Sequence, residues 1–192
     1  MKGFIERISN THPISENSWK ELQKLVEVKT YPPKYKLDEP GKVSEKAYYL
    51  LKGVAKSYCT SQEGKKINSG LYTDNSYIAE FTSLILRKPP AVSTLETITS
   101  CTLVEANYND FVKLTDTHSD LNIWHRKNLE TFYITLQKQD LSFANFNATE
   151  RYLNLIKEEP KIETLITQKN IAGHLGISQV QLSRIKKKLY RS

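Results

Sequence analysis

The stretch of residues 168–187 constrains this chain more than any other. Its apolar residues have the spacing that two short helices need in order to cross tightly, and Gly176 lies between them. Glycine supplies the positive φ that ends the first helix, and the small Ala172 lets the second backbone approach closely. Ser178, followed by Gln181, forms a cap for the second helix. The apolar positions are Ile171, Leu175, Ile177, Leu182 and Ile185. The stretch therefore predicts a helix-turn-helix.

The second of these helices would carry a polar face. Gln and Arg side chains in the first turns of such a helix can pair bidentately with adenine and guanine edges in the major groove of DNA. The face consists of Gln179, Gln181, Ser183, Arg184 and Lys187, with Val180 beside them. We therefore expect this helix to read DNA.

The charge of the chain is concentrated in the same region. Six Lys and Arg residues lie between Thr164 and Ser192, and no Asp or Glu lies there, whereas the whole chain has a net charge of +7. The basicity is thus local to the element that would meet phosphate. The alternative is a structural three-helix cap with a solvated lysine run. The coincidence of pattern and charge favours DNA binding.

Composition excludes several other classes of protein. The 192 residues are 39% hydrophobic, which is enough for packed cores, and two cysteines are too few for a disulfide framework or an iron-sulfur cluster. No apolar run approaches a membrane span, and the N-terminus lacks the apolar core of a signal peptide, so we expect a cytoplasmic protein. The four histidines lack a paired metal spacing. No nucleophile, carboxylate pair or glycine-rich phosphate loop stands out, so we expect neither an enzyme nor a cofactor.

The region from Tyr31 to Ala106 has a different character. It is rich in Tyr, Val, Ile, Thr and Leu in short runs that Pro and Gly residues interrupt. The predicted strands are Tyr48–Leu51, Val54–Cys59, Lys66–Tyr72, Val92–Ile98 and Cys101–Ala106, with hairpin-type connections at Lys52-Gly53 and at residues 62–64. This pattern predicts an antiparallel sandwich or barrel of about 75 residues.

Helices are predicted on both sides of this β-region. Ser15–Val28 and Asn109–Thr115 have helical spacing, Ser119–Leu141 contains neither Gly nor Pro, and Asn147 with Glu150 caps a further helix. The long helix is apolar on more than one side, so we expect its own β-domain and a second copy of the chain to cover it. The expected dimer residues are Leu121, Trp124, Leu129, Phe132 and Leu136. The alternative is a helix buried within one chain.

The predicted fold class is α+β. An antiparallel β-roll, or double-stranded β-helix, flanked by helices would occupy residues 1–118 as a sensor domain. Residues 119–141 would form the dimerisation helix, and residues 142–192 the helical DNA-binding domain.

This order of parts resembles the Crp/Fnr family of bacterial transcription regulators. The resemblance covers nearly the whole chain and rests on YYLLKGVAKSY, DNSYIAEFTSL, ATERYLNLI and ITQKNIAGHLGISQVQLSRIKKKL, in that order. It implies a cyclic-nucleotide-binding roll that feeds a dimerisation helix and a winged helix-turn-helix. It also implies a homodimer, double-stranded DNA as partner and RNA polymerase as a further partner.

The resemblance also assigns roles within the helix-turn-helix. Gln179, Val180 and Arg184 fall where side chains read bases, and Thr167 and Ser178 lie near phosphates. Gln168 and Lys188 complete the expected DNA-binding set.

The phosphate loop departs from the family pattern. Cyclic AMP binders have a glycine and a glutamate there, followed by an arginine that neutralises the cyclic phosphate and by a hydroxyl residue. Here the glutamate is retained, but alanine replaces the glycine, and proline and alanine replace the arginine and the hydroxyl residue. The predicted effector pocket consists of Ile78, Ala79, Glu80, Pro90, Ala91, Leu136 and Gln137. We predict that it does not bind cyclic AMP and that any effector is another small molecule.

Two alternatives at this loop stay open. Arg87 or Lys88 could replace the missing arginine from a shifted loop. Glu80 could simply accept backbone hydrogen bonds instead of meeting a ligand.

The sequence therefore predicts a homodimeric, sequence-specific transcription regulator. A second hypothesis is a small-molecule-sensing module that acts through a protein partner and does not bind DNA specifically. The salt dependence of DNA binding would distinguish them.

Overall fold

The computed structural model describes residues 4, 8, 10–86 and 90–189. Its strands are β1 (Glu27–Tyr31), β2 (Lys36–Asp38), β3 (Lys46–Lys52), β4 (Ala55–Thr60), β5 (Lys66–Tyr72), β6 (Ser76–Ile78), β7 (Thr94–Thr97) and β8 (Cys101–Asn107). Its helices include α2 (Glu16–Leu25), α3 (Phe81–Leu86), α4 (Tyr108–Thr117), α5 (Ser119–Asn145), α6 (Ala148–Glu158), α7 (Ile162–Leu165), α8 (Gln168–His174) and α9 (Gln179–Leu189). The predicted α+β class is confirmed.

The strands form two antiparallel four-stranded sheets, which enclose the core of a β-roll. Their orders are β1-β8-β3-β6 and β2-β7-β4-β5. Side chains from both sheets fill the space between them: Tyr48, Leu50, Ala55, Ile78, Leu95, Cys101 and Leu103. In β3 and β8 the inward residues are two positions apart, as the two-residue period of a strand requires.

One predicted connection is wrong. Lys52-Gly53 is not a hairpin, because β3 and β4 belong to different sheets. Gly53 has a φ of +118°, and its backbone N–H donates to Asp74 Oδ1 at 2.8 Å. This conformation, which side chains disfavour, turns the chain from one sheet to the other. The second predicted hairpin is confirmed, since β4 and β5 pair directly.

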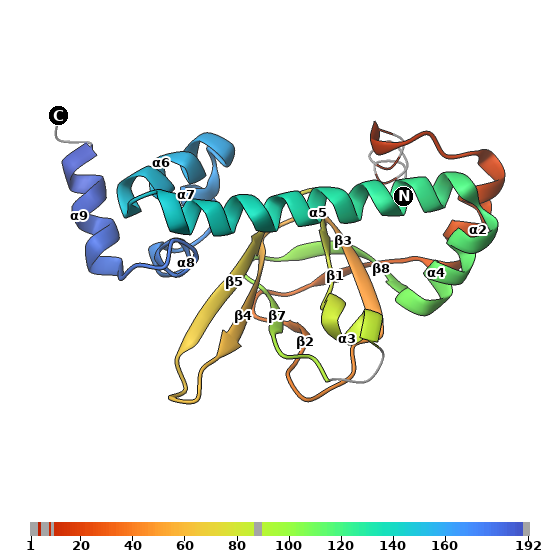
Figure 1. Cartoon of the computed structure of the whole chain (residues 1–192), viewed down its shortest axis with the longest axis horizontal. Helices are drawn as coiled ribbons and strands as arrows, with labels where there is room; N and C mark the ends of the chain where they lie inside the picture. Colours follow the sequence, from red (N-terminus) through yellow and green to blue (C-terminus); the bar gives the residue numbers. More distant parts are fainter. Residues whose placement is uncertain (1–3, 5–7, 9, 87–89, 190–192) are drawn as a thin grey trace.

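Helices cover the outer face of the β1-β8-β3-β6 sheet. Figure 1 shows α2 and α4 at one end of the molecule, with α5 running along most of the molecule's length. The side chains buried in this layer include Leu22, Tyr49, Val104, Phe111, Leu121 and Trp124. The first of these helices begins at a side-chain cap, because Ser15 accepts from the backbone N–H of Ser18.

The C-terminal helices have a core of their own, and the β-roll completes it. Buried residues of this core are Tyr152, Leu155, Ile162, Ile166, Ile171, Ala172, Leu175 and Leu182, together with Val54 from the roll. Leu71 and Ile98 of the roll pack against the same cluster. The helical domain is therefore docked onto the roll beside β4 and β5. Among the described residues, no helix has the length and apolarity that crossing a membrane requires.

Replacing Gly53 with alanine should destabilise the chain strongly. An added Cβ would lie 2.6 Å from the carbonyl oxygen of Ser100, at a positive φ that alanine disfavours. We expect Gly53→Ala to lower the free energy of unfolding by about 2 to 4 kcal/mol. Gly64→Ala is the control, because Gly64 also has a positive φ but open space around it. Gly64→Ala should lower the free energy of unfolding, measured with urea, by about 1 kcal/mol. Equal losses would show that crowding at the corner is unimportant.

Candidate nucleic-acid interface and effector pocket

The predicted helix-turn-helix consists of α8 and α9, joined at Gly176. This glycine has a φ of +68°, and a Cβ on it would lie 3.0 Å from the ring of Phe143. Both the turn conformation and the close approach therefore require glycine. Ile177 donates its backbone N–H to the carbonyl of Ala172 at 3.0 Å, which closes the turn.

Capping bonds define where these helices begin. The backbone N–H of Gln181 donates to Ser178 Oγ at 3.2 Å, and that of Ser178 donates to Gln181 Oε1 at 2.9 Å. The predicted box is thus confirmed, as is the box of Asn147 with Glu150 at the start of α6. Since their own cap engages the side chains of Ser178 and Gln181, the other residues of the face are freer to meet a ligand.

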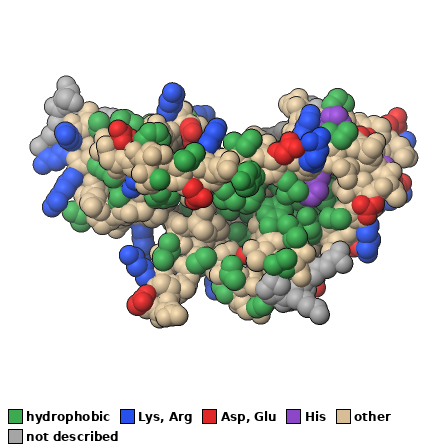
Figure 2. Space-filling model, viewed as in Figure 1, with side chains coloured by type: hydrophobic (Ala, Val, Ile, Leu, Met, Phe, Trp, Pro, Cys, Tyr) green, Lys and Arg blue, Asp and Glu red, His purple; other side chains and the backbone are tan. Residues whose placement is uncertain are grey.

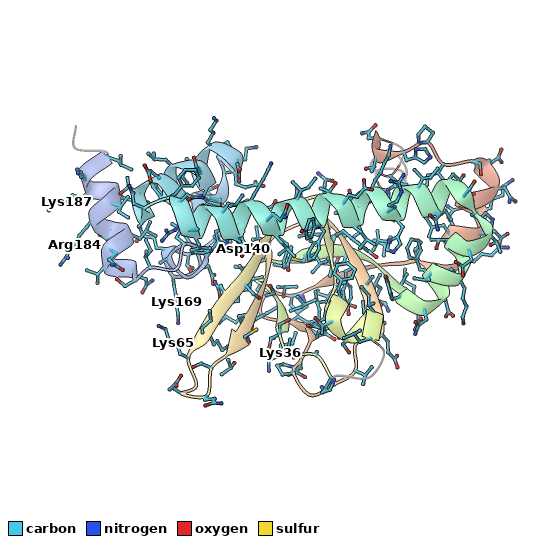
Figure 3. The ribbon with its side chains drawn as sticks, viewed as in Figure 1. Lys36, Lys65, Asp140, Lys169, Arg184 and Lys187 are labelled. Atoms are coloured by element: carbon cyan, nitrogen blue, oxygen red, sulfur yellow. The ribbon has the colours of Figure 1, made fainter. Side chains whose placement is uncertain are left out.

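The residues predicted to bind DNA all lie on the surface. The exposed set is Thr167, Gln168, Ser178, Gln179, Val180, Gln181, Ser183, Arg184, Lys187 and Lys188. By contrast, Leu182 on the opposite face of α9 is fully buried in the domain core. Figure 2 shows Lys and Arg side chains gathered over the end of the molecule that α9 forms. In Figure 3, Arg184 and Lys187 project outward from this helix.

One of the six basic residues counted from sequence does not belong to this surface. Lys186 Nζ lies 2.6 Å from Glu163 Oε1, and both side chains are largely covered. Glu163 also accepts from Tyr152 Oη at 2.9 Å, and its pKa is lowered by the bonds from these two residues, against the effect of burial. This ion pair fastens α9 to α7, so its charge is neutralised within the domain.

The predicted phosphate loop is packed by the chain itself. Glu80 is buried, and its carboxylate accepts the backbone N–H of Ser83 at 2.8 Å, in the first turn of α3. Ile78, Ala79 and Ala91 are also buried, whereas Pro90 is exposed. Glu80 thus accepts a backbone hydrogen bond, as the second alternative expected. The two basic candidates of the first alternative, Arg87 and Lys88, lie outside the described residues.

The electrostatics of the roll interior oppose an anion. Burial raises the pKa of Asp38 to about 6, and the negative charge of the nearby Glu80 adds to this effect. Lys29 and Lys46 each place Nζ 2.7 Å from Glu105 Oε1, so these cations already have a partner. Two neighbouring carboxyl groups disfavour a bound phosphate, and both of these lysines are already paired.

A cavity with both polar and apolar lining lies instead between α5 and the β5–β6 region. It has a volume of about 170 Å³. It is lined by Gly70, Leu71, Tyr72, Asn75, Ser76, Tyr77, Asn128, Thr131, Phe132, Thr135, Leu136 and Gln139. No charged side chain lines it. Of the predicted pocket residues only Leu136 takes part, because Gln137 is exposed and donates to Tyr133 Oη at 2.9 Å. No sequence pattern identifies the other lining residues, because the strands and the helix that face each other are far apart along the chain.

The structure corrects two of the expected dimer residues. Leu121 is 0% exposed and Trp124 is 4% exposed, and both lie in the core formed with the roll. They have no surface left for a second copy. Phe132 is half-buried, with its ring centroid 5.0 Å from that of Phe81, and Leu129 is also half-buried.

The exposed apolar residues of α5 lie elsewhere on the helix. Tyr133, Ile134 and Leu141 are 61%, 50% and 59% exposed, and Leu136 is 38% exposed. Ile134 and Leu141 are seven residues apart and share one face, which lies about a quarter of a turn around the helix from the face that Trp124 occupies. Among the described residues, no group of three or more His, Cys, Asp or Glu side chains is placed to hold a metal ion.

The stability of the chain should fall as the pH rises through the titration of Asp38. Its native pKa of about 6 exceeds the ordinary value of 3.8, so the native state binds more protons than the unfolded state between these values. Asp38→Asn, which mimics the protonated form, should therefore raise stability at pH 8 by roughly 1 to 2 kcal/mol and change it little at pH 4. Urea unfolding at both pH values measures this. A variant that is less stable than the parent chain at pH 8 would contradict the assignment.

Comparisons with known proteins agree with this architecture. Residues 28–118 match the family model of the cyclic nucleotide-binding domain. The c-di-GMP responsive global regulator CLP of Xanthomonas campestris is 17% identical, with 92% of each chain covered and a TM-score of 0.71. FixK2 of Bradyrhizobium japonicum is 15% identical over 87% of this chain and 85% of that chain, with a TM-score of 0.70.

A transcriptional regulator of the Crp/Fnr type from Eubacterium rectale is 16% identical, over 94% of this chain and 88% of that chain, with a TM-score of 0.71. No curated protein sequence matches the chain. Residues 28–118 thus match the cyclic nucleotide-binding domain, and the chain as a whole has the fold of the Crp/Fnr transcription regulators.

Proposed function

We propose that this chain is a homodimeric transcription regulator that binds specific DNA through α9 without cyclic AMP as effector. The observation that supports the proposal most is the exposed face of α9. It combines Gln179 and Arg184, whose side chains can read base edges, with Lys187, whose charge can meet phosphate. The fold is that of known transcription regulators, such as CLP and FixK2.

Dimerisation is part of the proposal. A reader of this kind binds two half-sites about 34 Å apart, so its two copies are related by a two-fold axis. The apolar face of α5 with Ile134 and Leu141 is the surface we assign to the partner copy, in place of the buried Leu121 and Trp124. Contact with RNA polymerase is expected of such a regulator and extends the proposal.

The effector, where one exists, is proposed to be an uncharged molecule. The cavity between α5 and β5 has hydroxyl, amide and aromatic groups but no charged side chain in its lining. Such a lining favours a neutral, hydrogen-bonding ligand over a cyclic phosphate. Cytoplasmic location follows from the proposed role.

The proposal is tested by titrating the purified protein against its own upstream DNA in a gel-shift experiment, with scrambled DNA as control. The titration is run at two salt concentrations, with and without cyclic AMP. We expect tight, sequence-selective and salt-sensitive binding that cyclic AMP does not change. The alternative, a module that acts through a protein partner, predicts weak binding with no sequence preference. No feature of the described residues favours that alternative.

Arg184→Ala should reduce affinity and relax base preference at one position. The expected loss is about 1 to 3 kcal/mol, because a bidentate contact with a base edge is removed. Lys187→Ala is the matched control, since it removes a charge from the same exposed face and should weaken all sequences alike. Binding to a library of operator variants measures both. If the two variants lose specificity in the same way, the assignment of reading and phosphate-contacting residues is wrong.

Leu141→Glu should convert the dimer into monomers. The substitution places a charge in the assigned seam, where a partner would have to desolvate it. Sedimentation velocity should show a monomer, and the affinity for a two-half-site DNA should fall steeply. Val43→Glu, at a position of the roll that is 53% exposed, is the control and should leave the dimer intact. A dimeric Leu141→Glu protein would exclude this face as the seam.

A further inference from the structure

The side chain of Arg151, near the start of α6, contacts the ends of two other helices. Its Nη1 donates to the carbonyl of Phe146, the residue that caps the C-terminus of α5, at 2.6 Å. Its Nε and Nη2 donate to the carbonyl of Leu175, which caps the C-terminus of α8, at 3.3 and 3.1 Å. The last carbonyls of a helix lack partners within the helix and carry partial negative charge. The guanidinium group therefore stabilises both helix ends at once.

The ring of Phe143, in the last turn of α5, completes this contact. Cζ of Arg151 lies 5.0 Å from the centroid of the Phe143 ring, which is within the range of a cation–π interaction. The same ring borders the turn between α8 and α9, since a Cβ on Gly176 would lie 3.0 Å from it. We call Phe143, Phe146, Arg151 and Leu175 the arginine clamp. It joins the end of α5 to the turn of the helix-turn-helix.

The backbone connection beside the clamp is short and extended. Phe146 and Asn147 alone lie between the end of α5 and the start of α6. Their φ values are −109° and −71°, and both residues have extended backbone conformations. Two extended residues can rotate, so the backbone by itself does not fix the angle between α5 and the helical domain. The arginine clamp supplies contacts that define this angle.

Arginine is suited to this position by its shape. Two edges of the planar guanidinium group are in use, one toward Leu175 and the other toward Phe146. Lysine would keep the positive charge, but its single nitrogen does not reproduce the fork of donors or the planar contact with a ring. Arg151→Lys therefore removes the clamp while it leaves the net charge of the domain unchanged.

We propose that Arg151 is a positioning residue that sets the spacing of the two half-sites that the dimer accepts. This inference rests on the proposed function. In the proposed dimer the two copies are joined along α5, and Figure 1 shows α9 beyond the end of that helix. The angle between α5 and the helical domain then determines how far apart the two α9 helices lie. A fixed angle favours one spacer length, because one base pair more or less both displaces and rotates a half-site.

The test measures binding to operators with the preferred spacer, with a spacer one base pair shorter or longer, and with a single half-site. We expect the parent chain to prefer one spacer by about tenfold, and Arg151→Lys to reduce this preference to about twofold. The affinity for the single half-site should change by less than about twofold, because the reading face of α9 is untouched. A merely structural role would instead weaken binding to every duplex by the same factor.

Arg126→Lys is the matched control. Arg126 is exposed on α5 and pairs with Glu130 of the same helix at 2.8 Å, so the same exchange there does not separate two elements. It should leave the spacer preference unchanged.

Three results would overturn the inference and leave the reading of DNA by α9 in place. They are a parent chain that binds its operator specifically with every spacer alike, an Arg151→Lys protein with the spacer preference of the parent, and a uniform loss on all duplexes. If the parent chain binds none of the duplexes specifically, the proposed function fails as well.

Discussion

The packing of the first half of α5 onto the β-roll is the interaction on which the rest of the structure depends. Leu121 and Trp124 are buried against Tyr49 and Phe111, so the helix is anchored at the end far from α9. Burial of side chains of this size contributes about 1.5 to 3 kcal/mol each. Because the anchored helix is continuous to Asn145, it carries the helix-turn-helix at a fixed distance from the roll.

The charged groups near Glu80 bear on which ligands the roll could bind. A nucleotide phosphate needs a cation at the loop that begins with Glu80, and there the structure has the carboxyl group of Asp38 close by. Lys29 and Lys46 pair with Glu105, and Tyr48 Oη donates to the Leu37 carbonyl at 3.2 Å. Side chains of the chain itself therefore fill the interior of the roll. The family match over residues 28–118 describes this roll.

Local sequence rules predicted the parts whose structure is set locally. Gly176, the Ser178–Gln181 box and the Asn147 cap depend on residues within a few positions of one another, and the structure has them as predicted. A Lys-Gly pair between two runs of strand residues predicts a hairpin. The same pattern also occurs where the chain turns from one sheet to another, as it does at Gly53. Only the assignment of the two strands to different sheets distinguishes them, and that depends on pairings far along the chain.

The same limit explains the errors on α5. Hydrophobic spacing identifies a helix that is apolar on several sides, but it does not say which side its own domain covers. The spacing therefore predicts Leu121 and Trp124 in the interface with a second copy of the chain, whereas the roll covers them. Lys186 is a similar case, because its partner Glu163 lies one residue outside the acid-free stretch that was counted.

The β4–β5 hairpin and α5 are two routes by which the roll can influence α9, and both line the cavity between α5 and β5. Leu71 lines this cavity and also packs against the core of the helical domain. Thr73 follows on the same chain segment and donates to Glu159, at the end of α6, at 2.7 Å. On the other wall, Leu136 belongs to the half of α5 that leads into the helical domain. A neutral molecule that separated these walls would therefore act on both supports of the helix-turn-helix at once, and it would need no contact with the buried carboxyl groups of the roll.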